Sequence, residues 1–182
     1  MHRTAEELEA FLPTLRAAPT DDGTLDLLVR RPAVGEREVL AEGELTLEEG
    51  LAGDTWRMRG SKRTPDGSAH PDMQLTLMSA RLVGFLARDP ERRALAGDQL
   101  YVDLELSRDN LPPGTRLRIG DAVVEVTDQP HTGCAKFLDR FGEPAMRFVN
   151  SGVGRELRLR GLNARVVVPG VVRPGDSVTK VR

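Results

Sequence analysis

The stretch GDQLYVDLELSRDNLPPGTRLRIGDAVVEV, residues 97–126, decides the fold class of this chain. Its apolar residues recur mostly at every second position, which is the spacing of half-buried β-strands. These residues are Leu100, Val102, Leu104, Leu106, Leu117, Ile119, Val123, Val124 and Val126. Leu111-Pro112-Pro113-Gly114 and Gly120-Asp121 supply turns, and the second is a short hairpin signal. The stretch therefore predicts consecutive strands of a β-barrel or β-sandwich.

Further strands and short helices are predicted on both sides of this stretch. Strand patterns cover 25–29, 39–47, 73–78, 162–168 and 171–181. Helical spacing follows Thr4, Ser79, Pro90, Cys134 and Pro144, and residues 57–71 are expected to form an exposed loop that borders a site. We expect a mainly β (α+β) fold with peripheral helices, organised as one domain over 1–182 that begins with an amphipathic helix within 1–20.

The composition is that of a water-soluble globule, with 39% hydrophobic and 30% charged residues among 182. A net charge of −2 provides no broad basic field, so a nucleic acid partner is not expected. No apolar run is long enough for a membrane span, and the first residues lack the apolar core of a signal peptide. The single cysteine cannot form an internal disulfide, which agrees with a reducing compartment, and we expect a cytoplasmic protein.

The cationic residues are unevenly distributed between types, with 23 Arg and 3 Lys. Guanidinium groups bind phosphate and carboxylate groups bidentately, so an Arg-rich surface can hold an anionic cofactor. A genomic preference for Arg codons is the alternative explanation.

The segment DQPHTGCAKF, residues 128–137, contains the residues most suited to chemistry. Cys134 lies near a predicted helix start, where free N–H groups and the cations His131, Lys136 and Arg140 would favour a thiolate, which is both a nucleophile and a soft metal ligand. Gly133 permits close approach of a ligand or of another backbone segment. The alternatives are that Cys134 is a small core residue and His131 a loop residue. No HExxH, CxxC or Walker-type motif is present.

Several motifs in one order resemble those of the MOSC family, the domain found at the C-terminus of molybdenum-cofactor sulfurases. They are Gly50-Leu51-Ala52-Gly53-Asp54, Gly97-Asp98-Gln99-Leu100, Leu117-Arg118-Ile119-Gly120-Asp121-Ala122, Pro130 to Cys134, Arg160-Gly161-Leu162-Asn163-Ala164, and Pro169 to Asp176. The resemblance is to a small stand-alone bacterial-type member, and it covers about residues 45–182. Many family members have Glu-Asn in place of Asp98-Gln99, and His in place of Trp56.

The resemblance implies a closed or partly open β-barrel of the MOSC or pyruvate-kinase-barrel type. It also implies binding of the molybdenum cofactor, or handling of sulfur for it, with Cys134 as the molybdenum ligand or as a persulfide carrier. We expect no pyridoxal-phosphate desulfurase domain of the kind found in the large sulfurases, so a separate cysteine desulfurase would have to supply sulfur. A molybdoenzyme is the other partner that the resemblance suggests.

We therefore expect a pocket between the turn at 97–100, the loop at 129–136 and the stretch 150–161. The predicted catalytic residues are Cys134 and His131, and the predicted cofactor contacts are Thr132, Gly133, Lys136, Gly97, Asp98, Gln99, Arg155, Arg158 and Arg160. The last three arginines could instead be a solvated helix end. Two other functions stay open: a non-catalytic binding module with an inert cysteine, and a cysteine-dependent hydrolase or peroxide-type enzyme with His131 as the base.

Overall fold

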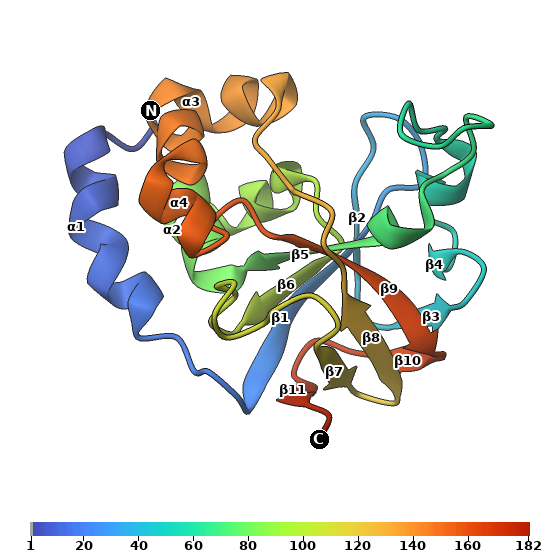
Figure 1. Cartoon of the computed structure of the whole chain (residues 1–182). Helices are drawn as coiled ribbons and strands as arrows, with labels where there is room; N and C mark the ends of the chain where they lie inside the picture. Colours follow the sequence, from blue (N-terminus) through green and yellow to red (C-terminus); the bar gives the residue numbers. More distant parts are fainter. Residues whose placement is uncertain (1) are drawn as a thin grey trace.

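The computed structural model describes residues 2–182, and its centre is a closed barrel of seven strands (Figure 1). Around the barrel the strands run in the order β11, β7, β8, β9, β5, β6 and β1, and β1 pairs again with β11. Among the strands of the described residues, β5 and β6 are the one parallel pair. The barrel strands are β1 (Gly23–Arg30), β5 (Leu75–Ser79), β6 (Leu100–Asp103), β7 (Arg116–Ile119), β8 (Ala122–Val126), β9 (Leu162–Val168) and β11 (Ser177–Lys180).

Strand β1 closes the barrel because it is long enough to serve two neighbours along one edge. Residues 23–24 pair with β11, whereas residues 28–30 pair with β2 (Glu38–Leu40). The opposite edge of β1 pairs with β6. A smaller sheet lies beside the barrel, in the order β10, β3 and β4. Its strands are β3 (Gly43–Thr46), β4 (Gly50–Leu51) and β10 (Gly170–Val172).

The four α-helices cover one side of the barrel, opposite the small sheet (Figure 1). The α-helices are α1 (Ala5–Arg16), α2 (Ala80–Ala87), α3 (Ala135–Asn150) and α4 (Gly152–Glu156), and the 3-10 helices are η1 (Thr55–Met58), η2 (Pro71–Met73) and η3 (Pro90–Ala96). Thr4 and Glu7 form a capping box at the start of α1. Gly142 has a non-helical backbone and divides α3 into two parts. None of the helices within residues 2–182 has the length and apolar character needed to cross a membrane.

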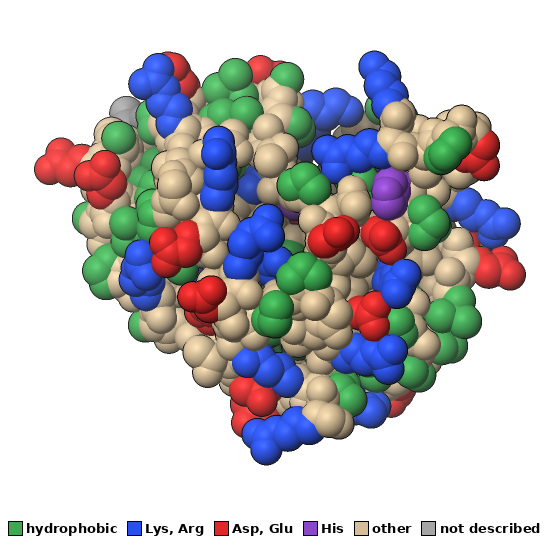
Figure 2. All heavy atoms as spheres, in the orientation of Figure 1, with side chains coloured by type: hydrophobic (Ala, Val, Ile, Leu, Met, Phe, Trp, Pro, Cys, Tyr) green, Lys and Arg blue, Asp and Glu red, His purple; other side chains and the backbone are tan. Residues whose placement is uncertain are grey.

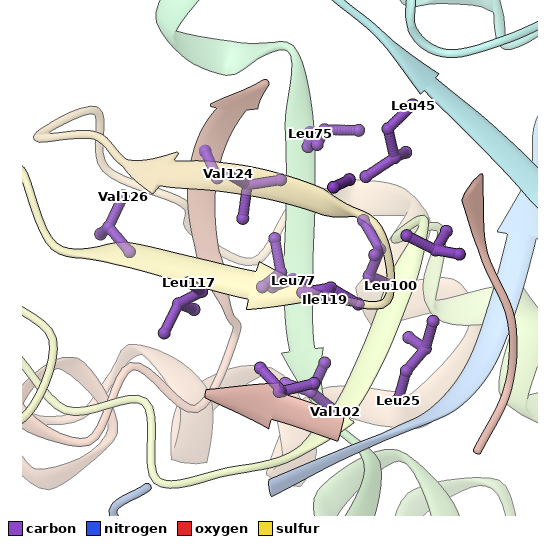
Figure 3. Close-up of a cluster of buried hydrophobic side chains, with 14 of the residues drawn as sticks. Leu25, Leu45, Leu75, Leu77, Leu100, Val102, Leu117, Ile119, Val124 and Val126 are labelled. Atoms are coloured by element: carbon purple, nitrogen blue, oxygen red, sulfur yellow. The ribbon is translucent and has the colours of Figure 1, made fainter. Parts of the chain in front are cut away.

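The outside of the molecule carries charged side chains of both signs, spread over the face seen in Figure 2. The apolar residues are divided between two cores. One core fills the barrel, where the side chains of Leu25, Leu77, Leu100 and Ile119 point towards one another (Figure 3). The other lies between the outside of the barrel and helices α1 to α3. The barrel is therefore packed solid, and any site must lie at its rim.

The predicted mainly β fold with a barrel and peripheral helices is confirmed. Two predicted strands are each divided in the structure, with one part in the eight-stranded sheet that forms the barrel and the other part in the small sheet. The stretch 39–47 forms β2 and β3, and the stretch 171–181 contributes to β10 and β11. The partner changes from β1 to β10 between β2 and β3, and from β3 to β7 and β1 between β10 and β11. Helix α4 was not predicted.

Candidate functional site

A cleft of about 200 Å³ opens beside Cys134, at the end of the barrel where four chain segments meet. We call it the thiol cleft. It lies between the start of α3 and the loops around residues 33–37 and 55–59, and Figure 2 shows a recess at the top of the molecule with Lys and Arg side chains at its border. Its lining residues are Arg31, Ala33, Val34, Gly35, Arg37, Thr55, Arg59, Ala96, Gly97, His131, Cys134, Lys136, Arg140 and Arg160.

The lining of the thiol cleft includes six Lys and Arg side chains and no carboxylate. Buried carboxylates neutralise two of the six cations, since Arg31 forms an ion pair with Asp54 and Arg160 forms one with Asp98. The other four form no ion pair with a carboxylate within residues 2–182, and they are Arg37, Arg59, Lys136 and Arg140. Such an excess of positive charge favours an anionic ligand.

The cations of the thiol cleft are close enough to repel one another. Burial lowers the pKa of Arg37, and the charges of Arg140 and Arg31 lower it further. The pKa of Arg59 is lowered by burial and by the charge of Arg31. The Nε atom of Arg37 is buried and has no hydrogen-bond partner in the described chain. An anion bound between these groups would relieve the repulsion.

Cys134 is exposed at the edge of this cleft. It occupies the N-cap position of α3, but its side chain caps no backbone N–H group. The preceding Gly133 donates its N–H group to Asn150 Oδ1 at 3.2 Å, and a Cβ atom at Gly133 would lie 2.5 Å from the sulfur of Met146. Close packing of Gly133 against α3 thus fixes the backbone next to Cys134, while the thiol stays free.

Beneath the cleft, the fully buried Asp98 holds two of the lining side chains. Arg160 Nη1 donates to Asp98 Oδ2 at 2.7 Å, and Nη2 donates to the carbonyl of Ala96 at 3.1 Å. His131 Nε2 lies 2.9 Å from Asp98 Oδ1. The backbone N–H group of Asp98 donates to the hydroxyl of Tyr101 at 3.2 Å. Asp98 therefore fixes the positions of His131 and Arg160 in the wall of the cleft.

The protonation states of this buried group follow from its charges. Burial alone would raise the pKa of Asp98, but the positive charges of Arg160 and His131 and their hydrogen bonds lower it to about 2. Burial lowers the pKa of His131, the charge of Arg160 lowers it further, and Asp98 opposes the decrease. At neutral pH a neutral His131 donates Nε2–H to the Asp98 carboxylate, and its Nδ1 atom carries a lone pair.

A second buried ion pair supports the opposite wall of the thiol cleft. Asp54 accepts two hydrogen bonds from the guanidinium of Arg31, at 2.7 and 2.8 Å, and one from its backbone at 3.0 Å. Asp54 also caps η1 through the N–H group of Trp56. Arg31 Nη1 donates to the carbonyl of Gly97 at 3.1 Å, so the two loops that meet at this wall are joined.

Five of the predicted site residues line the thiol cleft together: Gly97, His131, Cys134, Lys136 and Arg160. Asp98 and Gln99 are fully buried below it. The side-chain oxygen of Gln99 accepts hydrogen bonds from the backbone and the hydroxyl of Thr76, which ties β6 to β5. Gly133 lines neither this cleft nor the one described next.

The remaining predicted residues belong to a separate cleft of about 110 Å³, which we call the arginine cleft. Thr132, Arg155 and Arg158 line it, together with His131 and Arg160, which border both clefts. The expected single pocket is therefore two clefts on either side of residues 129–134. The full lining is Arg108, Thr127, Asp128, Gln129, Pro130, His131, Thr132, Val149, Asn150, Gly154, Arg155, Arg158, Arg160, Gly161 and Leu162.

Sequence reasoning missed three arginines of the thiol cleft, Arg31, Arg37 and Arg59. They come from the loops after β1 and after η1, which carry no motif of their own. The long loop beginning at residue 57 was expected to border a site, and Arg59 lies in it. No local signal in the sequence indicates the position of Arg37.

Comparison with known proteins agrees with this architecture. The family model of the MOSC domain matches residues 68–179, so the chain belongs to the MOSC domain family. A search of curated proteins gives no match. Among solved structures, the YUAD protein from Bacillus subtilis superposes with a TM-score of 0.62 at 15% identity, covering 88% of this chain and 97% of its own.

Two other solved structures have the same fold. YiiM from Escherichia coli has a TM-score of 0.55 and 24% identity, over 87% of this chain and 70% of its own. YiiM from Geobacillus stearothermophilus has a TM-score of 0.52 and 15% identity, over 91% of this chain and 75% of its own. At sequence identities of this size, the structural likeness shows that the proteins share a fold and shows nothing about function. The family as a whole is linked to the molybdenum cofactor.

Proposed function

We propose that the thiol cleft binds the molybdenum cofactor, with Cys134 as a soft ligand of the metal and the surrounding cations as the binding site for the anionic part. One observation carries this proposal: an exposed thiol without a hydrogen bond stands beside four cations that have no carboxylate partner within residues 2–182. Thiolate is a suitable ligand for a soft metal, and guanidinium and ammonium groups are suitable for phosphate.

The protein ligands available in the cleft are suited to a metal that is already bound in a cofactor. The described residues contain no group of three or more His, Cys, Asp or Glu side chains that could hold a metal ion by themselves. Cys134 would therefore provide one ligand, and the cofactor would provide others. A volume of about 200 Å³ is below the range of roughly 300–1,000 Å³ for complete ligand pockets, so the cleft would hold one end of such a cofactor.

The residues of this chain would have distinct tasks. Arg37, Arg59, Lys136 and Arg140 would bind and orient the anionic group. Through the lone pair of Nδ1, His131 would accept a proton from a group bound next to it, since Asp98 fixes the ring by accepting the hydrogen bond of Nε2. When bound, the cofactor would supply redox or sulfur chemistry.

A second candidate is sulfur carriage, which the exposure of Cys134 favours because a partner protein can reach the sulfur. The Cys134 thiolate would attack the terminal sulfur of a persulfide on a separate, pyridoxal-phosphate-dependent cysteine desulfurase. A new S–S bond would form on Cys134, the S–S bond of the donor would break, and the donor would leave as a thiolate. No external oxidant is needed.

A His-activated cysteine hydrolase is less well supported. No hydrogen bond joins Cys134 and His131 within the described chain, and His131 Nε2 is already bonded to Asp98. A nucleophile activated in this way needs its base within hydrogen-bond reach.

The test is reconstitution of the purified protein with molybdenum cofactor, followed by removal of free cofactor and elemental analysis. We expect molybdenum to be retained by the wild type, lost in Cys134→Ser, and reduced in Arg37→Gln/Arg140→Gln. Arg118→Gln is the matched control, because Arg118 is exposed on β7 and forms no ion pair with any of residues 2–182. Equal retention by wild type and Cys134→Ser, or no retention by the wild type, would overturn the proposal.

A further inference from the structure

We infer that the arginine cleft is a second, separate anion site that binds a phosphate-class oxyanion, either free or as the end of a larger molecule. The inference does not rest on the proposed function of the thiol cleft. Three arginines carry it: Arg108, Arg155 and Arg158 line the cleft, and none of them forms an ion pair within residues 2–182.

Arg158 is the buried member of this group, with only 9% of its surface exposed. The one hydrogen bond of its guanidinium within the described chain runs from Nη1 to the carbonyl of Leu111, at 2.6 Å. Its backbone has a positive φ of 47°, which is uncommon for a residue other than glycine. The chain thus holds a buried cation next to a cleft without a carboxylate to neutralise it, and such a charge is costly unless it is paired.

The neighbouring charges increase that cost. Burial lowers the pKa of Arg158, and the charge of Arg108 lowers it further, to about 10, although Glu105 acts in the opposite direction. The arginine cleft has one acidic side chain in its lining, Asp128, which accepts a hydrogen bond from Gln129 Nε2 at 3.0 Å. Arg160 is paired with Asp98, so three unpaired arginines face one carboxylate. The cleft has an excess of positive charge.

Further hydrogen-bond donors complete the lining. Asn150 and Thr132 line the cleft, and the Nε atom of Arg160, a residue with 5% exposure, is buried without a hydrogen-bond partner in the described chain. Arginine forks and amide N–H groups match the oxygens of a tetrahedral anion.

The size of the cleft limits what can bind. Its volume of about 110 Å³ corresponds to a few water molecules at roughly 30 Å³ each. A phosphate group fits in such a volume, whereas a pterin or nucleobase ring system does not. A larger ligand would therefore place only its phosphate in the arginine cleft. Because the segment 129–134 separates the two clefts, this anion would be distinct from one bound beside Cys134.

The experiment is a titration of ¹⁵N-labelled full-length protein with inorganic phosphate at constant ionic strength, observed by NMR. We expect saturable shifts of the backbone amides of Asn150 and Gly154, which line only the arginine cleft. In Arg108→Gln/Arg155→Gln the affinity reported by these amides should fall about tenfold or more, because charge-assisted hydrogen bonds are lost. Both arginines are exposed, so the variant should fold. Arg37→Gln/Arg140→Gln, which alters only the thiol cleft, is the matched control and should retain wild-type affinity at these amides.

A parallel titration with glycerol phosphate distinguishes the two sources of the anion. Equal or tighter binding of the ester supports a larger ligand, whereas much weaker binding supports free phosphate. The inference is overturned if the Asn150 and Gly154 amides do not shift saturably, or if Arg108→Gln/Arg155→Gln has the affinity of the wild type. Loss of molybdenum binding in Cys134→Ser has no bearing on this result, so failure of one proposal can be told from failure of the other.

Discussion

Replacing Asp98 by asparagine removes the negative charge that holds Arg160 and His131 at the border of the two clefts. Asp98 and Arg160 are both buried, and their side chains meet at 2.7 Å. Breaking one partner of a buried ion pair leaves the other charge unpaired, which costs roughly 3–5 kcal/mol. We therefore expect Asp98→Asn to lower the free energy of unfolding at pH 7 by that amount, and to preserve the size of the side chain.

The difference between wild type and Asp98→Asn should depend on pH in a defined window. The pKa of Asp98 is lowered from 3.8 to about 2 in the folded state, so the carboxylate contributes stability that is fully present above pH 4. This contribution is lost as the pH falls towards 2. The shift corresponds to about 2 kcal/mol, at 1.36 kcal/mol for each unit. The stability gap between the two proteins should narrow by more than half of this amount between pH 5 and 2.5.

His131 produces a separate change at higher pH. Its pKa in the folded protein is lowered from 6.5, so the unfolded chain takes up a proton first as the pH falls, and stability decreases below about pH 6.5. The variant His131→Gln should lack this decrease and retain the one below pH 4. Urea unfolding of the wild type, Asp98→Asn and His131→Gln, monitored by circular dichroism from pH 7.5 to 2.5, measures both pH-dependent changes in stability. A gap between wild type and Asp98→Asn that stays constant from pH 5 to 2.5 would refute the reasoning.

Three further substitutions test the supports of the clefts. Gly161 has φ +107°, and a Cβ atom there would clash with the carbonyl oxygen of Leu77, so Gly161→Ala should lower the free energy of unfolding by more than about 1 kcal/mol. The control Gly84→Ala lies in α2 with open space around it and should not lower the free energy of unfolding. Equal urea midpoints for the two variants would contradict this prediction. Asp54→Asn leaves Arg31 buried and unpaired, so we expect a loss of roughly 3–5 kcal/mol in urea unfolding, and a loss below 1 kcal/mol would show that the pair is solvated. Gly133→Ala should push Met146 aside and reduce molybdenum retention with a smaller loss of stability than Gly161→Ala, and unchanged retention would mean that the Gly133 packing does not position Cys134.

The barrel could be predicted from the sequence wherever its signal is local. The alternation of Leu117 and Ile119 with polar residues, the turn at Gly120-Asp121 and the valines that follow all lie within ten residues, and they form the hairpin of β7 and β8. The capping signals at Thr4 and Ser79 also act over three or four residues, and both cap helices.

The division of 39–47 into two strands could not be predicted in this way. Residues 38–40 pair with β1, whereas residues 43–45 pair with β10, which lies more than 120 positions later in the chain. Both halves have strand-like residues, so periodicity alone cannot show where the partner changes. The same limit applies to the clefts. Arg37 and Arg59 line the same cleft as Cys134 only because the loops after β1 and η1 fold over the end of the barrel.

The two aspartates of the glycine-aspartate motifs show why so cationic a cleft can be stable without its ligand. Asp54 and Asp98 are buried below the thiol cleft, and each neutralises one arginine of the wall, Arg31 or Arg160. The cations that are left unpaired are nearer the surface, where water screens their repulsion. The buried arginines are thus paired with carboxylates, whereas the cations that a ligand can reach are unpaired. An anion with several negative charges should therefore bind beside Cys134 more tightly than an anion with one.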